Sequence, residues 1–203
     1  MLIANLQFAQ MDNDLSTEFM DKSANTANRL IQKMSSTIND FRNFFSPDKE
    51  KSAFSALQQI RQAVGLVEAA FKNSNISIVI NAEKDCTLNG FPNEYSQVLL
   101  NLLSNAKEAI QAIETLPGLI TISLTRETGM GVVKICDTGG GIPDTVLDKI
   151  FEPYFSTKNM GTGIGLYMSK MIIERNMNGF ISAHNVESGA EFIVSLPLAE
   201  ELS

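Results

Sequence analysis

Hydrophobic residues near the N-terminus recur at alternating steps of three and four. Between residues 24 and 45 they are Ala24, Ala27, Ile31, Met34, Ile38, Phe41 and Phe45. This heptad spacing predicts a helix with one narrow apolar seam, capped by Ser16 and ended before Pro47. Leu2, Leu6 and Ala9 predict the last turns of a preceding helix, so we expect a truncated helical hairpin over residues 1–46. So narrow a seam favours pairing with a second copy of the chain, as a homodimer.

A charged connector at residues 46–51 separates this region from a different pattern, so we expect a second domain over residues 47–203. Ser55 and Gln58 form a capping box for a helix with an apolar face of Leu57, Ile60, Val64, Val67 and Phe71. Strands are predicted at 76–80, 119–125, 131–136, 180–183 and 191–196, and further helices at 93–113 and 166–176. This order predicts an α+β fold in which helices cover one face of a mixed sheet.

The composition of the chain excludes several classes of binding partner. The 203 residues carry a formal net charge of -7, which disfavours DNA, RNA and anionic membranes. No apolar run is long enough to span a bilayer, and the first ten residues lack the features of a signal peptide. Cys86 and Cys136 lie far apart in predicted strands, without the clustering of a disulfide framework or zinc site. We therefore expect a cytoplasmic location for this chain, which is compatible with a parent protein anchored in the inner membrane.

Two asparagines are candidate metal ligands. Asn101 and Asn105 are four residues apart, on one face of the predicted 93–113 helix, while Val98, Leu99, Leu102 and Leu103 cover its buried face. Both amides then point toward one place. Amide oxygens can bind Mg²⁺, which usually takes few protein ligands and fills its shell with water and phosphate oxygens.

Two glycine-rich segments follow. Asp137 ends a predicted strand, where its carboxylate can accept a hydrogen bond from the exocyclic amine of adenine. Gly139, Gly140 and Gly141 then let the backbone approach a planar base closely. Gly161, Gly163 and Gly165 precede the 166–176 helix, whose free N–H groups can bind phosphate together with the Thr162 hydroxyl. Lys158, just upstream, can reach a terminal phosphate.

Each of these signals is weak by itself. A Gly-x-Gly-x-Gly run is more often a plain loop-to-helix junction, paired asparagines more often a polar helix edge, and Asp137 more often a turn residue. All three in this order and these settings are much harder to obtain by chance. Residues 137–162 are also too long for an ordinary connection, and such loops are usually functional.

Together the segments resemble the N, G1 and G2 boxes of sensor histidine kinases, within the superfamily of gyrase, heat-shock chaperone and mismatch-repair ATPases. Phe151-Glu-Pro-Tyr-Phe-Ser-Thr-Lys158 resembles the F box in the lid of these kinases. The resemblance covers about residues 50–198 and implies the Bergerat ATP-binding fold, a two-layer α/β sandwich. It implies ATP and Mg²⁺ as cofactors, and a lid over about residues 143–160 that orders over bound nucleotide.

Site residues follow from the same resemblance. Asn105 is implied as the principal Mg²⁺ ligand with Asn101 beside it, Asp137 as the adenine acceptor, and Asn101 and Lys158 as the catalytic pair. The implied nucleotide-binding set is Asn101, Asn105, Glu108, Ala109, Asp137, Gly139, Gly141, Ile142, Lys158, Gly161, Thr162, Gly163, Ile164, Gly165 and Leu166.

The chain departs from the family in two ways. Many members carry a basic residue at the position of Glu108, so the phosphate donor on this helix is open, with Lys107 next to it. The family's phospho-accepting histidine is also missing, since the sole histidine, His184, falls in a predicted strand of the second domain. We expect His184 to be an ordinary strand or edge residue, and the acceptor to lie upstream in a longer parent protein.

The leading hypothesis is transfer of the γ-phosphate of ATP to that upstream histidine, for relay to the receiver domain of a response regulator. One alternative is ATP hydrolysis of the gyrase or mismatch-repair kind. Those relatives carry a glutamate as general base where this chain has Asn101, which cannot accept a proton. Another alternative is a nucleotide-gated binding module, such as an anti-sigma-type regulator, without turnover.

Overall fold

The computed structural model describes residues 17, 19–28, 31, 50–113, 117–158 and 161–199. The chain divides into two compact units, Met1–Asp48 and Lys49–Ser203. In the first unit, residues 17, 19–28 and 31 are helical. The predicted helix at residues 2–9, the seam positions from Met34 to Phe45 and the Ser16 cap lie outside the described residues, so the hairpin stays a prediction.

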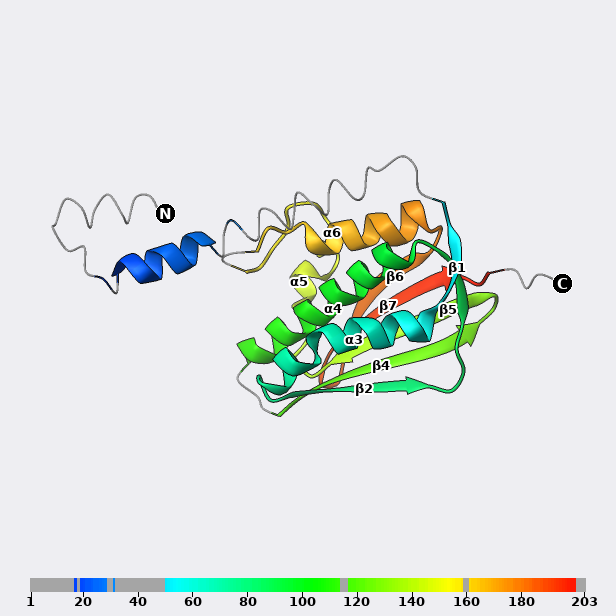
Figure 1. The fold of residues 1–203 in the computed structure, drawn as a ribbon, viewed down its shortest axis with the longest axis horizontal. Coiled ribbons are helices and arrows are strands. Elements are labelled where there is room, and N and C mark those ends of the chain that lie inside the picture. The colour runs from blue at the N-terminus through cyan, green and yellow to red at the C-terminus, as the bar shows by residue number, and fades with distance from the viewer. Residues whose placement is uncertain are drawn as a thin grey trace. The chain divides into compact units, whose positions relative to one another are not determined.

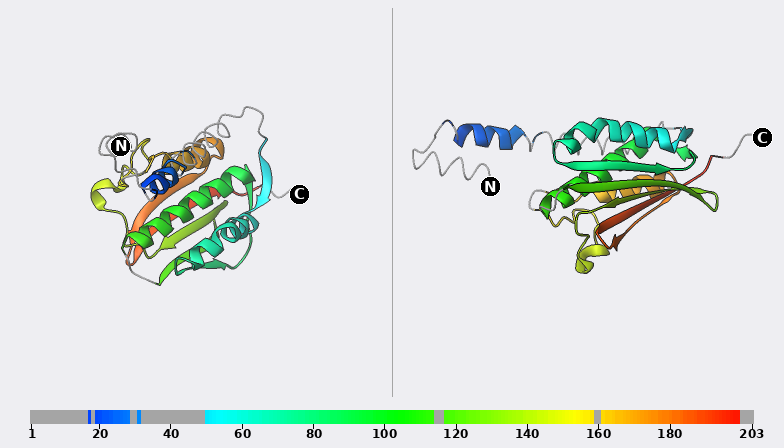
Figure 2. Two further views of the ribbon diagram at one scale, coloured as in Figure 1. Left: turned by 60° about the vertical axis from the view of Figure 1, so that its left-hand side comes forward. Right: turned by 90° about the horizontal axis from the view of Figure 1, so that it is seen from below.

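The second unit is built on a five-stranded sheet with the order β2-β4-β5-β7-β6. Its strands are β2 (Ile76–Ala82), β4 (Gly118–Glu127), β5 (Met130–Asp137), β6 (Phe180–Val186) and β7 (Gly189–Pro197). β2 and β4 pair in parallel and the other neighbours pair antiparallel, so the sheet is mixed. All five predicted strands and the mixed-sheet fold class are confirmed. Figure 1 shows helices α3, α4 and α6 on one face of this sheet, and Figure 2 shows the same layering from below.

Helix α3 (Ala56–Lys72) begins as the capping box predicts. The Gln58 N–H donates to Ser55 Oγ at 2.9 Å, and Asp85 holds the same cap by accepting from Ser55 Oγ. The fully buried stripe of the helix is Ala56, Ile60, Ala63 and Phe71, and Leu57, Val64 and Val67 of the predicted apolar face are half-buried at its edges.

Helix α4 (Pro92–Ala112) supplies the centre of the core. Proline at its start costs nothing, because the first N–H groups of a helix lack a partner in any case. Its buried side chains recur at steps of three and four and pack toward the sheet: Tyr95, Val98, Leu99, Leu102, Leu103, Ala106 and Ile110. This spacing leaves Asn101, Asn105 and Glu108 together along a second, less buried face.

Three details were not predicted. β1 (Ser52–Ser55) and β3 (Thr87–Gly90) form a separate two-stranded sheet, and Cys86 precedes β3 rather than lying in a strand. The predicted 166–176 helix is an α-helical part, α6 (Gly165–Lys170), which runs directly into a π-helical part, η1 (Met171–Asn176). In the long 137–162 loop, the described residues include the short helix α5 (Asp144–Leu147). No helix within the described ranges is long and apolar enough to cross a membrane.

Candidate nucleotide-binding site

The start of α6 lies directly against Asn101 of α4. A Cβ atom added to Gly165 would stand 2.5 Å from Asn101 Oδ1, so only glycine permits this approach. The Asn101 Nδ2 group donates to Ser169 Oγ at 2.9 Å, and the Ser169 hydroxyl donates to the Gly165 carbonyl at 3.0 Å. These contacts fix the Asn101 amide beside the glycine-rich segment.

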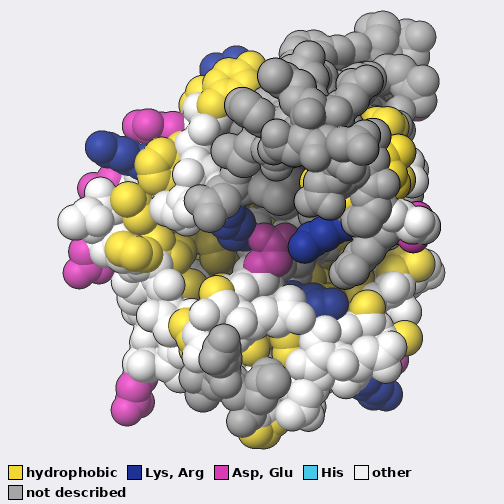
Figure 3. Space-filling model, turned by 90° about the vertical axis from the view of Figure 1, so that its left-hand side faces the viewer, with side chains coloured by type: hydrophobic (Ala, Val, Ile, Leu, Met, Phe, Trp, Pro, Cys, Tyr) yellow, Lys and Arg dark blue, Asp and Glu magenta, His cyan; other side chains and the backbone are white. Residues whose placement is uncertain are grey.

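The second asparagine of α4 meets the lid. Lys158 Nζ donates to Asn105 Oδ1 at 3.1 Å and to Glu108 Oε2 at 2.5 Å. The ammonium group shows that the Asn105 amide oxygen is oriented to accept a cation. Figure 3, which views the end of the molecule at the left of Figure 1, shows acidic side chains bordered by Lys and Arg near the centre of this face.

Asp137 ends β5 and is 2% exposed. Its Oδ1 accepts from the Gly139 N–H at 2.7 Å and from the Ala190 N–H at 3.3 Å. The hydrogen bonds that Asp137 accepts from the described residues all go to Oδ1, which leaves Oδ2 without a donor among them. Burial raises the pKa of this carboxyl, while the two N–H donors oppose the shift. Asp137 thus presents one open acceptor oxygen, as recognition of an amine requires.

The turn after Asp137 packs against α4 as well. A Cβ at Gly139 would stand 2.6 Å from Ala109 Cβ, so the turn and the helix approach more closely than any side chain would permit. Gly140 and Gly141 have φ of +78° and +83°, a left-handed conformation that glycine adopts without strain. Ala109 and Gly139, both predicted site residues, are therefore in contact.

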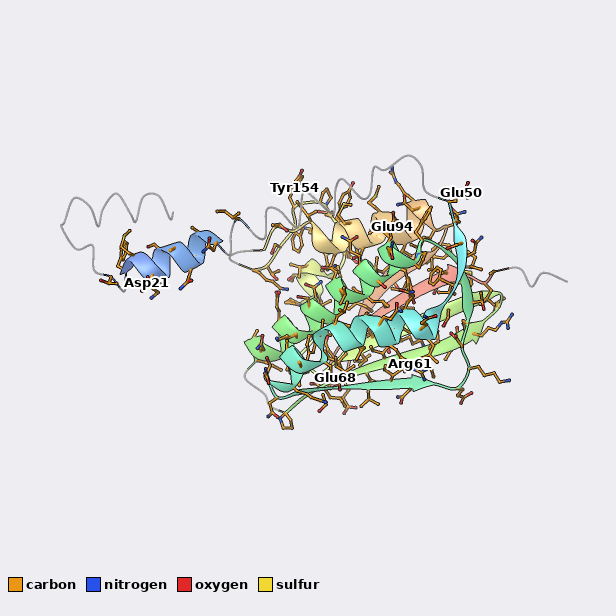
Figure 4. The ribbon with its side chains drawn as sticks, viewed as in Figure 1. Asp21, Glu50, Arg61, Glu68, Glu94 and Tyr154 are labelled. Carbon is orange, nitrogen blue, oxygen red and sulfur yellow. The ribbon has the colours of Figure 1, made fainter. Side chains whose placement is uncertain are left out.

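The F-box segment is held at its first residue and at its middle. Phe151 packs edge-on against Phe192 of β7, with ring centroids 6.4 Å apart, and Lys170 lies 5.7 Å above its ring. Gly163, with φ of +65°, lies so close to the backbone of Tyr154 and Phe155 that a Cβ would stand 2.4 Å from Tyr154 C. The Tyr154 side chain is 75% exposed and projects outward (Figure 4). The glycine-rich segment and the F-box segment thus lie against each other.

Three segments far apart in the sequence consequently meet on one helix. Gly165 touches Asn101, Lys158 touches Asn105, and Gly139 touches Ala109. Gly141 and Ile142 lie instead against the β6–β7 hairpin, through Asn185. The remaining predicted residues lie at the start of α6. Gly161, Thr162 and Ile164 precede the helix, and Leu166 lies in its first turn.

Several residues of the site were missed by sequence reasoning. Asn185 pairs with both backbone groups of Ile142, Ala190 donates to Asp137, and Ser169 orients Asn101. Gly189 is required because a Cβ there would stand 2.0 Å from the Asp137 carbonyl oxygen. None of these four carries a local signal, because each acts through strand pairing or helix packing.

His184 lies in the edge strand β6, as expected. Its Nε2 is 3.1 Å from Glu191 Oε1 on the neighbouring strand β7. His184 is the cross-strand partner of Glu191, whereas Asp137 is the cross-strand partner of Ile120 on β4. The Glu191 and Cys136 positions are also cross-strand partners, so His184 belongs to a row of residues distinct from that of Asp137.

The residues on α4 fit a metal-bound nucleotide. No cluster of three His, Cys, Asp or Glu side chains within the described ranges is placed to hold a metal ion. A metal at this site would therefore depend on amide and phosphate oxygens, the hard ligands that Mg²⁺ prefers. Asn105 Oδ1, one such oxygen, already faces a cation, because it accepts a hydrogen bond from the Lys158 ammonium at 3.1 Å.

Comparison with known proteins agrees with this geometry. Residues 90–200 match the family described as histidine kinase-, DNA gyrase B-, and HSP90-like ATPase. The chain is 36% identical over 146 residues to the two-component sensor PprA of Pseudomonas aeruginosa, an alignment that covers 68% of this chain and 15% of PprA. It is 30% identical over 182 residues to the sensor protein FixL of Bradyrhizobium diazoefficiens, covering 90% of this chain and 35% of FixL.

Solved structures show the same fold. The nucleotide-free catalytic domain of the histidine kinase ThkA superposes with a TM-score of 0.67 at 32% identity, covering 73% of this chain and 96% of that one. ThkA in complex with the response regulator TrrA gives a TM-score of 0.77 at 25% identity, covering 99% of this chain and 58% of that one. The chain spans well under half the length of the curated relatives described above. By sequence and by fold, this chain belongs to the family of histidine kinase-, DNA gyrase B- and HSP90-like ATPases, on its sensor histidine kinase branch.

Proposed function

We propose that this chain is the ATP-binding catalytic core of a sensor histidine kinase, which transfers the γ-phosphate of ATP to a histidine outside the chain. The observation that carries the proposal is the meeting of three segments on α4: Gly165 at Asn101, Lys158 at Asn105 and Gly139 at Ala109. Family membership already implies nucleotide binding. The proposal adds which residues bind which part of the nucleotide.

Asp137 would bind the base. Its Oδ2 would accept a hydrogen bond from the exocyclic amine of adenine, while Oδ1 would keep its hydrogen bonds from the N–H groups of Gly139 and Ala190. Guanine presents a carbonyl oxygen in place of that amine and would meet the carboxylate with repulsion. Gly139 and Gly141 would leave room for the base plane, with Ile142 beside it.

Asn105 and Asn101 would hold Mg²⁺ through their amide oxygens, and the bound metal would supply charge neutralisation for the phosphates. The backbone N–H groups from Gly161 to Leu166 lie where the chain enters the continuous α6–η1 helix, a setting that favours phosphate. Lys158 would move its ammonium onto the terminal phosphate.

Phosphoryl transfer through a loose transition state depends mainly on positioning and charge neutralisation. A kinase of this kind requires no general base from the chain, because the acceptor imidazole supplies its own lone pair. This suits Asn101, whose amide has no proton-accepting role and donates to Ser169. The Glu108 carboxylate on the same helix face is ion-paired to Lys158.

The acceptor histidine, a homodimer through the N-terminal helices and relay to a response regulator belong to this proposal for the parent protein. ThkA, a structural relative, forms a complex with its response regulator TrrA. A receiver domain is the corresponding partner proposed here.

Transfer can be tested directly. The chain, labelled ATP and Mg²⁺ would be mixed with a histidine-bearing helical hairpin from the parent protein. We expect label on the hairpin that is acid-labile and base-stable, as phosphohistidine is, and no such label with Asp137→Asn. Release of inorganic phosphate without any labelled hairpin would favour the ATPase alternative, and nucleotide binding with neither product would favour a binding module.

A further inference from the structure

Lys158 bridges two side chains that lie one turn apart on α4. Its ammonium donates to Asn105 Oδ1 at 3.1 Å and to Glu108 Oε2 at 2.5 Å. Residues at i and i+3 share a helix face, so both acceptors point toward the lid. The contact joins the far end of the F-box segment to the helix that carries both asparagines.

The neighbouring lysine is directed elsewhere. Lys107 Nζ donates to the Ala70 carbonyl of α3 at 3.1 Å and lies 5.2 Å above the Phe71 ring. It therefore faces α3 and does not share the Asn105 and Glu108 face. The lysine that reaches this face from the described residues is Lys158, which answers the question left open by the acidic residue at position 108.

An ammonium group has three N–H donors, and two of those of Lys158 are occupied here. Mg²⁺ bound at Asn105 would take the Oδ1 atom that Lys158 now uses, which would free one donor for a phosphate. The contact with Glu108 does not compete with the metal for any atom. Glu108 can therefore keep hold of the lysine throughout.

We propose that Glu108 is a positioning residue, which holds Lys158 against α4 before nucleotide arrives and so delivers a lid charge to the phosphates. This inference rests on the proposed function. The predicted effect on nucleotide affinity is opposite to simple electrostatic expectation. A carboxylate beside a polyphosphate should weaken binding by repulsion. We expect the removal of Glu108 to weaken binding instead, because Lys158 is no longer held.

The side chains of Lys158 and Glu108 are 45% and 51% exposed, so water screens their attraction and the effect is modest. Exposed pairs of this kind correspond to a change of about two- to fivefold in an equilibrium constant. For Glu108→Gln in the full chain, we expect the Kd for Mg²⁺·ATP to rise about two- to fivefold. The Kd for adenosine, which has no phosphate, stays unchanged, whereas general damage to the site would weaken both.

A second measurement needs no ligand. Hydrogen exchange of the lid amides between Asp144 and Lys158 should become faster in the nucleotide-free Glu108→Gln variant. The charge exchange Glu108→Lys with Lys158→Glu should restore slow exchange, because it rebuilds the ion pair. Asp148→Asn removes an exposed lid carboxylate outside the F-box segment and serves as the matched control, with no expected change in either measurement.

Tighter binding of Mg²⁺·ATP to Glu108→Gln, or lid exchange equal to that of the unchanged chain, would overturn the positioning role. An unchanged chain that fails to bind Mg²⁺·ATP would instead refute the proposed function. In that case the exchange data on the nucleotide-free protein still decide whether Glu108 holds the lid.

Discussion

The side-chain amide of Asn185 pairs with both backbone groups of Ile142. The Ile142 N–H donates to Asn185 Oδ1 at 2.7 Å, and Asn185 Nδ2 donates to the Ile142 carbonyl at 2.7 Å. Asn185 lies in β6, whereas Ile142 follows the glycine turn after Asp137. The amide thus fixes the start of the lid to the β6–β7 hairpin.

Asn185→Ala should loosen this turn. The two hydrogen bonds to Ile142 and a weaker one to Asp144 are lost from an exposed residue, so we expect the free energy of unfolding to fall by about 1 kcal/mol and ATP affinity to fall by about five- to tenfold. Asn185→Asp keeps the acceptor for the Ile142 N–H but loses the donor and adds a charge beside Asp144. It should not restore affinity. Ser182→Ala changes an exposed residue of the same strand and serves as the control. If all three variants bound ATP as tightly as the unchanged chain, the role of Asn185 would be refuted.

Two glycines should respond to alanine in opposite directions. At Gly189 a Cβ would stand 2.0 Å from the Asp137 carbonyl oxygen, so backbone must shift, and we expect a loss of about 1–3 kcal/mol in unfolding free energy. At Gly65, inside α3, no atom lies within 4 Å of the added Cβ. Alanine there should stabilise by about 0.5–1 kcal/mol, because it reduces the freedom of the unfolded chain. Urea denaturation of both variants tests this, and destabilisation by Gly65→Ala would contradict it.

Asp137 should make stability depend on pH in an unusual direction. Burial raises its pKa in the folded protein above the value of 3.8 expected for the unfolded chain. The folded state then binds the proton more tightly, so the free energy of unfolding falls as pH rises from about 3.8 through the raised pKa. Asp137→Asn lacks this titration.

The difference in unfolding free energy, variant minus unchanged chain, should therefore grow with pH across that window and then level off. Denaturant titrations at a series of pH values measure it. A difference independent of pH would show that the buried carboxyl does not titrate as the structure requires. The same variant should also lose ATP binding, so a gain in stability at neutral pH would accompany a loss of function.

The sequence predicted the elements whose signal is local. Continuous β-branched runs marked all five strands of the main sheet, and the spacing of apolar residues marked α4 with both asparagines on its other face. β1 and β3 were missed because each is short and has little β-branched character. The π-helical end of the last helix was also missed. Just beyond it, the Gly179 N–H donates to the Ile173 carbonyl, a contact that no sequence pattern encodes.

The candidate site residues could be chosen from the sequence, but the contacts between them could not. Asn105 and Asp137 follow from spacing and from position at a strand end. By contrast, the orientation of Lys107 toward α3, and the approach of Lys158 to Glu108, depend on how α3, α4 and the lid pack together. The same holds for Asn185, whose partner is 43 residues away in the sequence.

The central claim, one adenine nucleotide site assembled on α4 with Asp137 reading the base, is tested most directly by thermal unfolding with and without Mg²⁺·ATP. At a ligand concentration of about 100 times Kd, binding adds about 2.7 kcal/mol. We expect the midpoint of the unchanged chain to rise by about 5–10 °C and Asp137→Asn to lose most of that rise. An unchanged midpoint at saturating nucleotide, or an equal rise in both proteins, would contradict the account.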